Sequence, residues 1–210
     1  KQLQQRLGLE PQYIDGLRVT SAESLSLVKM VLAGRVNKRL VAALSEAGLD
    51  AFGMSGVDRA CIRATKLTHP GGDLGFVGEV ARVRTEVFTR LLDEGVTPVV
   101  SPICYGPGGD IFNVNADHVA VALAVALRAG QLVFVSNVPG VLQDDTLLPT
   151  LTPPRVDALT GAGVIHGGMV PKVRSAVRAV EQGVASVRIT DLTGLKTGAG
   201  TVITGAEAGD

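Results

Sequence analysis

Two amides and a carboxylate occupy alternate positions, Asn113, Asn115 and Asp117, directly before an apolar run of residues. An asparagine offers a hydrogen-bond donor and an acceptor together, which suits the carboxylate or amide of a small substrate. Lys172 lies further along the chain, where we expect the first turn of another helix. A lysine there attracts phosphate together with the backbone N–H groups of the helix start. A carboxylate at one helix start and a lysine at another are components of a phosphoryl-transfer site.

Each of these residues also has an ordinary structural explanation. Asn115 or Asp117 can simply cap the following helix, because helix starts favour Asn and Asp. We expect Pro171 at the first helical position, where its missing N–H is harmless. Lys172 can then be a solvent-exposed side chain, since opposing the helix dipole costs at most about 1 kcal/mol. Arg18 can bind a carboxylate through two parallel hydrogen bonds, but it can equally be a surface arginine.

The motifs of several other kinds of site are missing from the sequence. The chain contains no Gly-Lys-Ser/Thr sequence, which rules out a Walker A loop. Residues 161–166 resemble a dinucleotide-binding fingerprint, but His166 replaces its third glycine and the segment follows a predicted helix, so we reject it. His69, His118 and His166 are scattered without metal-ligand spacing. We therefore predict structural or solvated histidines and no protein metal site.

Alternating strands and helices must position the candidate residues. Apolar runs and period-two alternation predict strands over residues 50–54, 79–84, 97–103, 132–136 and 187–190. Helical periodicity predicts helices over residues 36–47, 85–94, 117–128, 153–159 and 171–181. A capping box from Thr20 to Glu23 begins an earlier helix, which we expect Gly34 to interrupt. The alternation predicts an α/β fold with an open, mainly parallel sheet.

Composition narrows the class of protein. Hydrophobic residues make up 46% and charged residues 19% of the 210 residues, so a sizeable core is expected. The 20 Lys and Arg balance the 20 Asp and Glu, and this balance gives no reason to expect a nucleic-acid or membrane partner. Cys61 and Cys104 are expected to be buried free thiols in a reducing compartment, which favours a cytoplasmic location. The missing initiator methionine suggests that the chain begins inside a longer gene product.

Short motifs in a fixed order resemble the amino acid kinase family over nearly the whole chain. Within that family they are most similar to the branch that phosphorylates N-acetyl-L-glutamate in arginine biosynthesis. The motifs are Gly16-Leu-Arg-Val-Thr20, Gly34-Arg-Val-Asn-Lys-Arg-Leu-Val41, Met54-Ser-Gly-Val-Asp58, Asp73-Leu-Gly-Phe-Val-Gly-Glu-Val80, Asn113-Val-Asn-Ala-Asp117, Ser136-Asn-Val-Pro-Gly-Val141, Gly168-Met-Val-Pro-Lys-Val173 and Gly198-Ala-Gly-Thr201.

The resemblance implies a three-layer αβα sandwich that binds the amino-acid substrate in residues 1–112 and ATP in residues 113–210. By position, Arg18 would bind the substrate carboxylate, and Asn113 and Asn115 would hold the acetylglutamate. Asp117 would orient the catalytic lysines, and Lys172 would stabilise the transferring phosphoryl group. The nucleotide would be contacted by Ser136, Asn137, Val164 and Met169.

The same resemblance implies the cofactor and the partners. Mg²⁺ would be bound through the phosphates of ATP, and the protein would form a homo-oligomer, either a dimer or a hexamer. The family's Lys-x-Gly-Gly strand and His-Gly-Gly-Gly loop, which supply a second catalytic lysine and the phosphate cradle, would precede Lys1. We therefore expect the N-terminal strand region to be missing from this chain. Asn137 stands where the family usually has Asp, and the tail over residues 190–201 is shorter than usual.

Two alternative functions are left open by the sequence. One is the kinase of lysine biosynthesis that phosphorylates a carrier-bound aminoadipate, because the segment from Ser136 to Gly140 fits that group too. The other is a non-catalytic regulatory module that binds an amino acid or a nucleotide, which the missing N-terminal motifs suggest. The motifs around Arg18 and Asn113 favour acetylglutamate.

Overall fold

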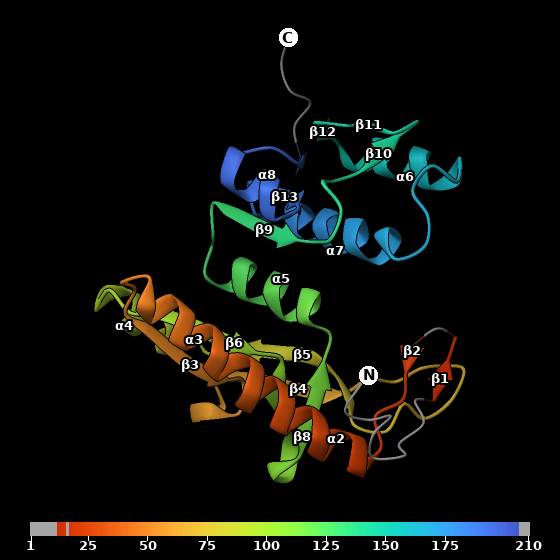
Figure 1. Cartoon of the computed structure of the whole chain (residues 1–210). Helices are drawn as coiled ribbons and strands as arrows, with labels where there is room; N and C mark the ends of the chain where they lie inside the picture. The colour runs from red at the N-terminus through yellow and green to blue at the C-terminus, as the bar shows by residue number, and fades with distance from the viewer. Residues whose placement is uncertain (1–11, 16, 206–210) are drawn as a thin grey trace. The chain divides into compact units, whose positions relative to one another are not determined.

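The computed structural model describes residues 12–15 and 17–205, and the chain divides into two compact units (Figure 1). The N-terminal unit comprises residues 1–119 and the C-terminal unit residues 120–210. The boundary between them falls inside helix α5, Ala116–Ala126, close to the predicted boundary after residue 112. Both units combine helices with strands, which confirms the predicted α/β class. Among the described residues, no helix is long and apolar enough to span a lipid bilayer.

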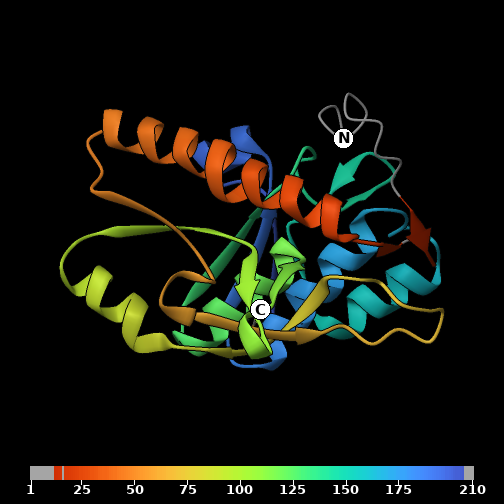
Figure 2. The same ribbon diagram turned by 90° about the horizontal axis from the view of Figure 1, so that it is seen from below.

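A long helical rod begins the N-terminal unit. It consists of α2, Ala22–Lys29, the π-helical segment η1, Met30–Val36, and α3, Asn37–Glu46, which follow one another without a break (Figure 2). The prediction that Gly34 interrupts the helix is wrong, because Gly34 lies inside η1. A single glycine in a helix interior costs only about 1 kcal/mol relative to alanine, which the flanking helical residues can offset.

The start of this rod differs by one residue from the predicted capping box. Ser21 is the N-cap, and its hydroxyl accepts a hydrogen bond of 3.2 Å from the N–H of Ser24. Thr20, the predicted cap, is fully buried instead and forms an isolated parallel β-bridge with Gly75. Thr20 therefore pairs with the segment around Gly75, and the neighbouring Ser21 caps the helix in its place.

Strands β3, Ala51–Ser55, and β6, Thr97–Ser101, pair in parallel behind the rod. Helix α3 covers the face of this sheet toward which Gly53 points, because a Cβ at Gly53 would lie 2.2 Å from Oδ1 of Asn37. Asn37 is itself buried, and its Nδ2 donates a hydrogen bond of 2.7 Å to the carbonyl of Val99 in β6. A polar side chain of the rod therefore ties it to the sheet.

Helix α4, Thr85–Asp93, covers the opposite face of the same two strands. Successive side chains of a strand point to opposite faces, so Phe52 and Met54 point away from α3. Both line a cavity of about 510 Å³ together with Val87 and Leu91 of α4. The N-terminal unit thus has a local helix–sheet–helix layering.

Four further strands of the N-terminal unit pair in a closed arrangement. β4 and β5 are antiparallel, as are β7 and β8, and the two pairs join through parallel contacts. The predicted single strand over residues 97–103 is wrong, because Pro102, which has no N–H to donate, separates β6 from β7. The remaining elements of this unit are β1 (Tyr13–Ile14), β2 (Leu17–Arg18), η2 (Asp58–Ala60), β4 (Ile62–Lys66), β5 (Val77–Val83), β7 (Ile103–Tyr105), η3 (Pro107–Gly109) and β8 (Ile111–Val114).

The C-terminal unit is built on a four-stranded sheet of order β12-β14-β13-β9. β13 pairs in parallel with β9 and antiparallel with β14, while β12 pairs in parallel with β14. The elements are β9 (Gln131–Val135), β10 (Leu142–Gln143), β11 (Thr146–Leu147), β12 (Thr150–Leu151), α6 (Pro153–Gly161), α7 (Met169–Glu181), β13 (Ser186–Thr190), α8 (Leu192–Thr197) and β14 (Thr201–Thr204).

Helix α7 closes the core of this unit. Its fully buried residues Val173, Ala176 and Ala179 recur every three residues, as expected for one face of a helix. They belong to the same buried cluster as Val187 and Ile189 of β13, which are also fully buried. The small alanines allow the helix to approach the sheet closely, so this face anchors α7 in the core.

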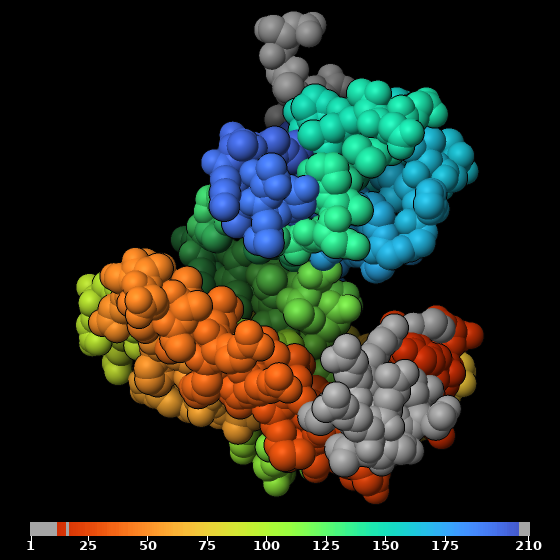
Figure 3. Space-filling model, viewed as in Figure 1, coloured from red at the N-terminus to blue at the C-terminus, as the bar shows by residue number. Residues whose placement is uncertain are grey.

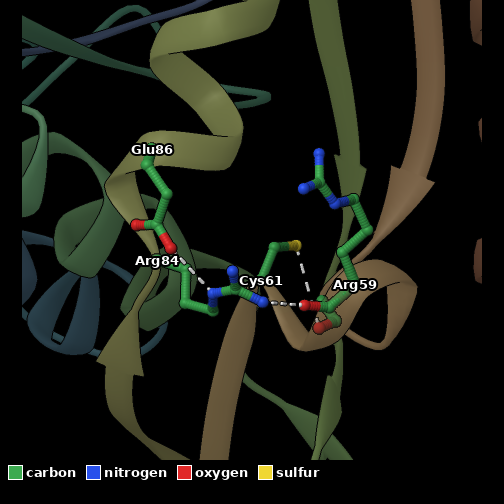
Figure 4. A network of polar contacts seen from close by, with 5 residues as sticks. Arg59, Cys61, Arg84 and Glu86 are labelled. Atoms are coloured by element: carbon green, nitrogen blue, oxygen red, sulfur yellow. Dashed lines mark hydrogen bonds and ion pairs between the residues drawn. The ribbon is translucent and has the colours of Figure 1, made fainter.

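Both cysteines are free and buried in the N-terminal unit, as predicted. The Sγ atom of Cys61 lies 3.3 Å from the carbonyl oxygen of Ser55. Figure 4 shows the polar contacts beside it, where Arg84 donates to the carbonyl of Arg59 and to Oε1 of Glu86, both at 2.8 Å. These contacts hold the turn before β4 against the start of α4.

The burial of the two thiols predicts that stability falls in alkaline solution. Burial raises the pKa of Cys61 from 9.0 to about 11, with a further contribution from Asp58, and burial raises the pKa of Cys104 to about 12. The folded state therefore keeps both thiols neutral above pH 9, where the unfolded chain ionises them. We expect the unfolding free energy to drop by about 1 kcal/mol per thiol between pH 8 and pH 10. Urea titrations should show a smaller drop in Cys104→Ala; an equal drop would contradict this prediction.

Candidate active site

The side chain of Asn113 is held by a neighbouring segment of the N-terminal unit. Asn113 lies in β8 and is half-buried, and its Nδ2 donates a hydrogen bond of 3.3 Å to Oγ1 of Thr20. Thr20 is anchored in turn, because its N–H donates to the carbonyl of Leu74 at 3.0 Å and its carbonyl accepts from Phe76 at 2.8 Å. The segment that carries Arg18 therefore approaches the strand that carries Asn113.

Gly75 makes this close approach possible. Its φ of +68° suits glycine, and an added Cβ would lie 2.3 Å from the carbonyl oxygen of Thr20. Its N–H donates a hydrogen bond of 2.8 Å to Oδ1 of Asp73, whose carboxylate also pairs with Lys66 at 2.8 Å. The hydrogen bond from Lys66, and then the one from Gly75, lower the pKa of Asp73. The turn is thus held in one conformation by charge and by backbone contacts.

Arg18 lies in the short hairpin β1–β2, two residues before Thr20. It is half-buried in β2, and its Cα partner across the antiparallel pair is Tyr13. His69 packs near the hairpin turn, with Nδ1 3.9 Å from a carboxylate oxygen of Asp15 and 3.1 Å from the N–H of Gly71. These local contacts fit the predicted structural role of His69.

Asn115 caps helix α5. Its Oδ1 accepts a hydrogen bond of 2.8 Å from the N–H of Asp117, and its carbonyl accepts one of 3.0 Å from Val119. The capping alternative for Asn115 is therefore confirmed. β8 ends at Val114, so Asn115 lies just beyond the strand that carries Asn113. Asp117 is half-buried in the first turn of α5, as predicted.

Two replacements of Asn115 separate its capping role from its predicted substrate contact. Asn115→Asp keeps a good N-cap, so we expect an unchanged melting temperature, whereas Asn115→Ala should lose about 1 kcal/mol of stability. If the amide contacts a substrate carboxylate, the new negative charge in Asn115→Asp should raise KM for the acidic substrate about tenfold or more. Kinetics and thermal melts of both variants measure the two effects. An unchanged KM in Asn115→Asp would mean that Asn115 only caps the helix and does not contact the substrate.

In the C-terminal unit, helix α7 brings Lys172 near an aromatic ring. The ammonium nitrogen of Lys172 lies 4.9 Å from the ring centroid of Phe134, which is buried in β9. The prediction that Pro171 is the first helical residue is wrong, because α7 begins at Met169 with Gly168 as N-cap. Pro171 still lies among the helix-start positions whose N–H groups have no partner within the helix, so its missing N–H remains harmless. Lys172 is two positions further into the helix than expected, as its fourth residue.

The start of α7 is open enough to receive an anion. A Cβ added at Gly167 or Gly168 would meet nothing within 4 Å, and Gly167 adopts a φ of +56°. The first helical N–H groups, of Met169 and Val170, donate hydrogen bonds of 3.3 Å to the carbonyls of His166 and Gly167. The positive end of the helix dipole together with a lysine in the same turn is a favourable place for a phosphate group.

The four predicted nucleotide contacts lie in two segments of the C-terminal unit. Ser136 and Asn137 follow β9, with Oγ of Ser136 3.4 Å from Oδ1 of Asn137, and the N–H of Ser136 donates to the carbonyl of Thr190 at 2.7 Å. Val164 and Met169 are partly buried against the core cluster before and at the start of α7. Both segments border strands or helices that the core fixes in place.

Three residues with a part in this arrangement were given no role in the site from the sequence. Thr20 holds Asn113, Phe134 contacts Lys172, and Thr201 binds the loop after β9. For Thr20 and Thr201 the available signal was their place at the ends of the motifs Gly16–Thr20 and Gly198–Thr201. The ring of Phe134 carried no signal, because a single aromatic residue in a buried strand is ordinary core.

Two other features of the described residues bear on the position of the site: a cavity in the N-terminal unit, and the distribution of side chains that could bind a metal ion. The cavity between β3 and α4 is lined by none of the predicted site residues. Among the residues that the structure describes, no three or more His, Cys, Asp or Glu side chains gather to hold a metal ion.

Comparisons with known proteins agree over most of the chain. The amino acid kinase family matches residues 1–191. The acetylglutamate kinase of Roseiflexus sp. (strain RS-1) is 51% identical over 205 residues, which cover 98% of this chain and 78% of that protein. The acetylglutamate kinase of Methanopyrus kandleri is 47% identical over 207 residues, covering 95% and 84%.

Solved structures are similar as well. The structure of smu.665 from Streptococcus mutans UA159 matches with a TM-score of 0.87 and 32% identity, over 98% of this chain and 81% of that chain. N-acetylglutamate synthase from Neisseria gonorrhoeae, complexed with coenzyme A and N-acetyl-glutamate, matches with a TM-score of 0.83 and 29% identity. That match covers 99% of this chain and 50% of the synthase.

Proposed function

The chain belongs to the amino acid kinase family, and from this premise we infer that it transfers the γ-phosphoryl group of ATP to the γ-carboxylate of N-acetyl-L-glutamate in arginine biosynthesis. The observation that carries this inference is an identity of about half, over nearly the whole chain, with proteins named acetylglutamate kinase. The predicted fold class, an αβα sandwich of the amino acid kinase family, is confirmed by the same matches.

In the proposed reaction, residues of the N-terminal unit bind the amino acid. Arg18 pairs with a substrate carboxylate, and Asn113 and Asn115 hydrogen-bond the acetylglutamate. The hydrogen bond from Asn113 to Thr20 supports this role, because it orients the amide before substrate arrives. A γ-carboxylate oxygen attacks the γ-phosphorus in line, the bond to the β–γ bridging oxygen breaks, and an acyl phosphate and ADP result. The carboxylate is already ionised at neutral pH, so no general base is needed.

The proposed phosphate-binding residues come from the C-terminal unit. Lys172 and the N–H groups at the start of α7 neutralise charge on the transferring phosphoryl group, and Asp117 orients the catalytic lysines. Ser136, Asn137, Val164 and Met169 contact the nucleotide. Mg²⁺ bound through the phosphate oxygens of ATP would add further charge neutralisation there. Catalysis then consists of positioning and electrostatic stabilisation.

A coupled assay of ADP release tests the function directly. Full-length protein is incubated with ATP and, in separate reactions, N-acetylglutamate, glutamate and a carrier-bound aminoadipate. Of the three acceptors, we expect only N-acetylglutamate to support ADP release from ATP. Hydroxylamine should trap the acyl phosphate as a hydroxamate. Turnover only with the carrier-bound substrate would favour the lysine-pathway alternative. ATP binding without any turnover would favour a regulatory module.

We propose in addition that the protein forms a homo-oligomer, as a dimer or a hexamer. The helical rod from α2 to α3 forms a ridge on its unit (Figure 3) and carries the exposed apolar side chains of Met30, Val36 and Leu40. Apolar side chains gathered on one element support burial against another copy. Light scattering at several concentrations distinguishes a monomer from either oligomer.

The cytoplasmic location stays a prediction from the sequence.

A further inference from the structure

We propose that Thr201 is a positioning residue for the nucleotide, acting through the loop that follows β9. This inference rests on the proposed function, which assigns Ser136 and Asn137 of that loop to nucleotide contact. The loop, residues 136–141, is held at both ends by strands β13 and β14. Thr201 itself is fully buried and holds the far end of the loop.

The hydroxyl of Thr201 uses both of its hydrogen-bonding capacities. Its Oγ1 accepts a hydrogen bond of 2.8 Å from the N–H of Val141 and donates one of 2.7 Å to the carbonyl of Leu148. One side chain at the start of β14 therefore links the end of the loop to the segment after the β10–β11 hairpin. A buried hydroxyl in such a position is costly to remove, because both backbone partners lose their bond.

Gly140 brings the loop into direct contact with this threonine. A Cβ added at Gly140 would lie 2.5 Å from Oγ1 of Thr201 and 2.9 Å from its backbone nitrogen. The φ of Gly140 is +153°, a value that residues with a side chain rarely adopt. The backbone of the loop thus packs directly on Thr201, at a distance that only glycine permits.

The near end of the loop is fixed by the adjacent strand. The N–H of Ser136 donates a hydrogen bond of 2.7 Å to the carbonyl of Thr190, the last residue of β13. Thr190 is also fully buried, and its Oγ1 donates to the carbonyl of Ala199 at 2.7 Å. β13 and β14 are antiparallel neighbours with Ile189 opposite Thr201. Both ends of the loop are consequently anchored to one rigid strand pair.

Such anchoring predicts an effect on nucleotide binding that is separate from the chemical step. A loop already fixed in its binding conformation avoids the entropy of ordering when ATP arrives. Loss of the Thr201 hydroxyl should loosen the loop and weaken ATP binding. Lys172 lies on α7, which Thr201 does not contact through any of these hydrogen bonds, so kcat at saturating ATP should change little.

Thr201→Val removes the hydroxyl while keeping the branched shape, and Thr201→Ser restores the hydroxyl. We expect Thr201→Val to raise the Kd for ATP, measured by calorimetry without acceptor, and the KM for ATP about tenfold. kcat should stay within about threefold, and KM for N-acetylglutamate should not change. Thr201→Ser should restore ATP affinity. A folded Thr201→Val with unchanged ATP affinity overturns the proposal, as does a lowered melting temperature as its sole effect.

Asn137→Ala covers the case in which Thr201→Val does not fold. Asn137 is exposed in the same loop, so its removal leaves the core intact. Raised Kd for ATP in Asn137→Ala supports a nucleotide-contacting loop, and an unchanged Kd overturns the proposal. Calorimetry also separates this inference from the proposed function. A wild type that binds ATP without phosphorylating N-acetylglutamate contradicts the function alone, whereas equal ATP affinity in wild type and folded Thr201→Val contradicts the positioning role alone.

Discussion

Replacing Lys172 with alanine is expected to lower kcat by about three orders of magnitude, with little change in KM for either substrate. The lysine ammonium compensates charge that spreads over the phosphoryl oxygens in the transition state, so its loss raises the barrier more than it weakens ground-state binding. The variant should fold normally, because Lys172 is half-buried at the start of α7 and the core face of that helix is unchanged. Steady-state kinetics together with thermal melts measure the effect.

Arg174→Ala is the matched control for this experiment. Arg174 lies two residues along the same helix, carries the same charge and is exposed. Its removal should leave kcat within about twofold, because an exposed charge acts weakly through solvent. A loss of activity in Arg174→Ala equal to that in Lys172→Ala would mean that helix charge, not the lysine itself, matters. Retained kcat in Lys172→Ala would contradict its catalytic role and favour a binding module.

Replacing Gly75 with alanine is expected to destabilise the protein by roughly 2 to 3 kcal/mol and to raise KM for N-acetylglutamate. The added Cβ would lie 2.3 Å from the carbonyl oxygen of Thr20, which is backbone and must shift. Thr20 holds the side chain of Asn113, so the displacement reaches a predicted substrate contact. Urea unfolding measures the stability, and initial rates at varied N-acetylglutamate measure KM.

Gly95→Ala isolates the steric part of this effect. Gly95 ends helix α4 with a φ of +77°, and a Cβ there would meet nothing within 4 Å. Its replacement should cost about 1 kcal/mol from the backbone conformation alone and leave KM unchanged. If both variants lose the same free energy of unfolding, the contact of the new Cβ with Thr20 contributes nothing to the loss in Gly75→Ala. A stable Gly75→Ala with normal KM would contradict the proposed link between Gly75 and Asn113.

The elements with strong local signals were predictable from the sequence. Helix α4 and strand β13 lie close to their predicted bounds, because their apolar periodicity and their Gly boundaries agree. The errors arose where a distant segment decided the outcome. Thr20 pairs with Gly75 instead of capping α2, and Asn113 is held by Thr20 from another part of the chain. Residue-by-residue propensity contains no term for such partners.

The candidate site shows the same division. The types and spacing of Asn113, Asp117 and Lys172 suggested phosphoryl transfer, but the substrate could be named only through the resemblance. Asn115 illustrates the limit, since its sequence position fits a cap and a ligand contact equally, and the structure adds a capping bond without testing the contact. The contacts that hold Asn113 and Lys172, through Thr20 and Phe134, depend on packing between distant segments.

The buried Asn37 restricts how relatives of this protein can diverge. Its Oδ1 lies where a Cβ of Gly53 would be, while its Nδ2 binds the carbonyl of Val99. A Cβ at Gly53 would also lie 2.8 Å from Cγ2 of Val41 and 2.8 Å from Nζ of Lys38. A larger residue there therefore requires that Asn37 be lost and that these two side chains shift. Loss of Asn37 in turn removes the donor that binds the carbonyl of Val99. The two positions should change together in descent, with a larger residue at one accompanied by a smaller residue at the other. Aligned sequences from distant lineages would reveal this paired inheritance.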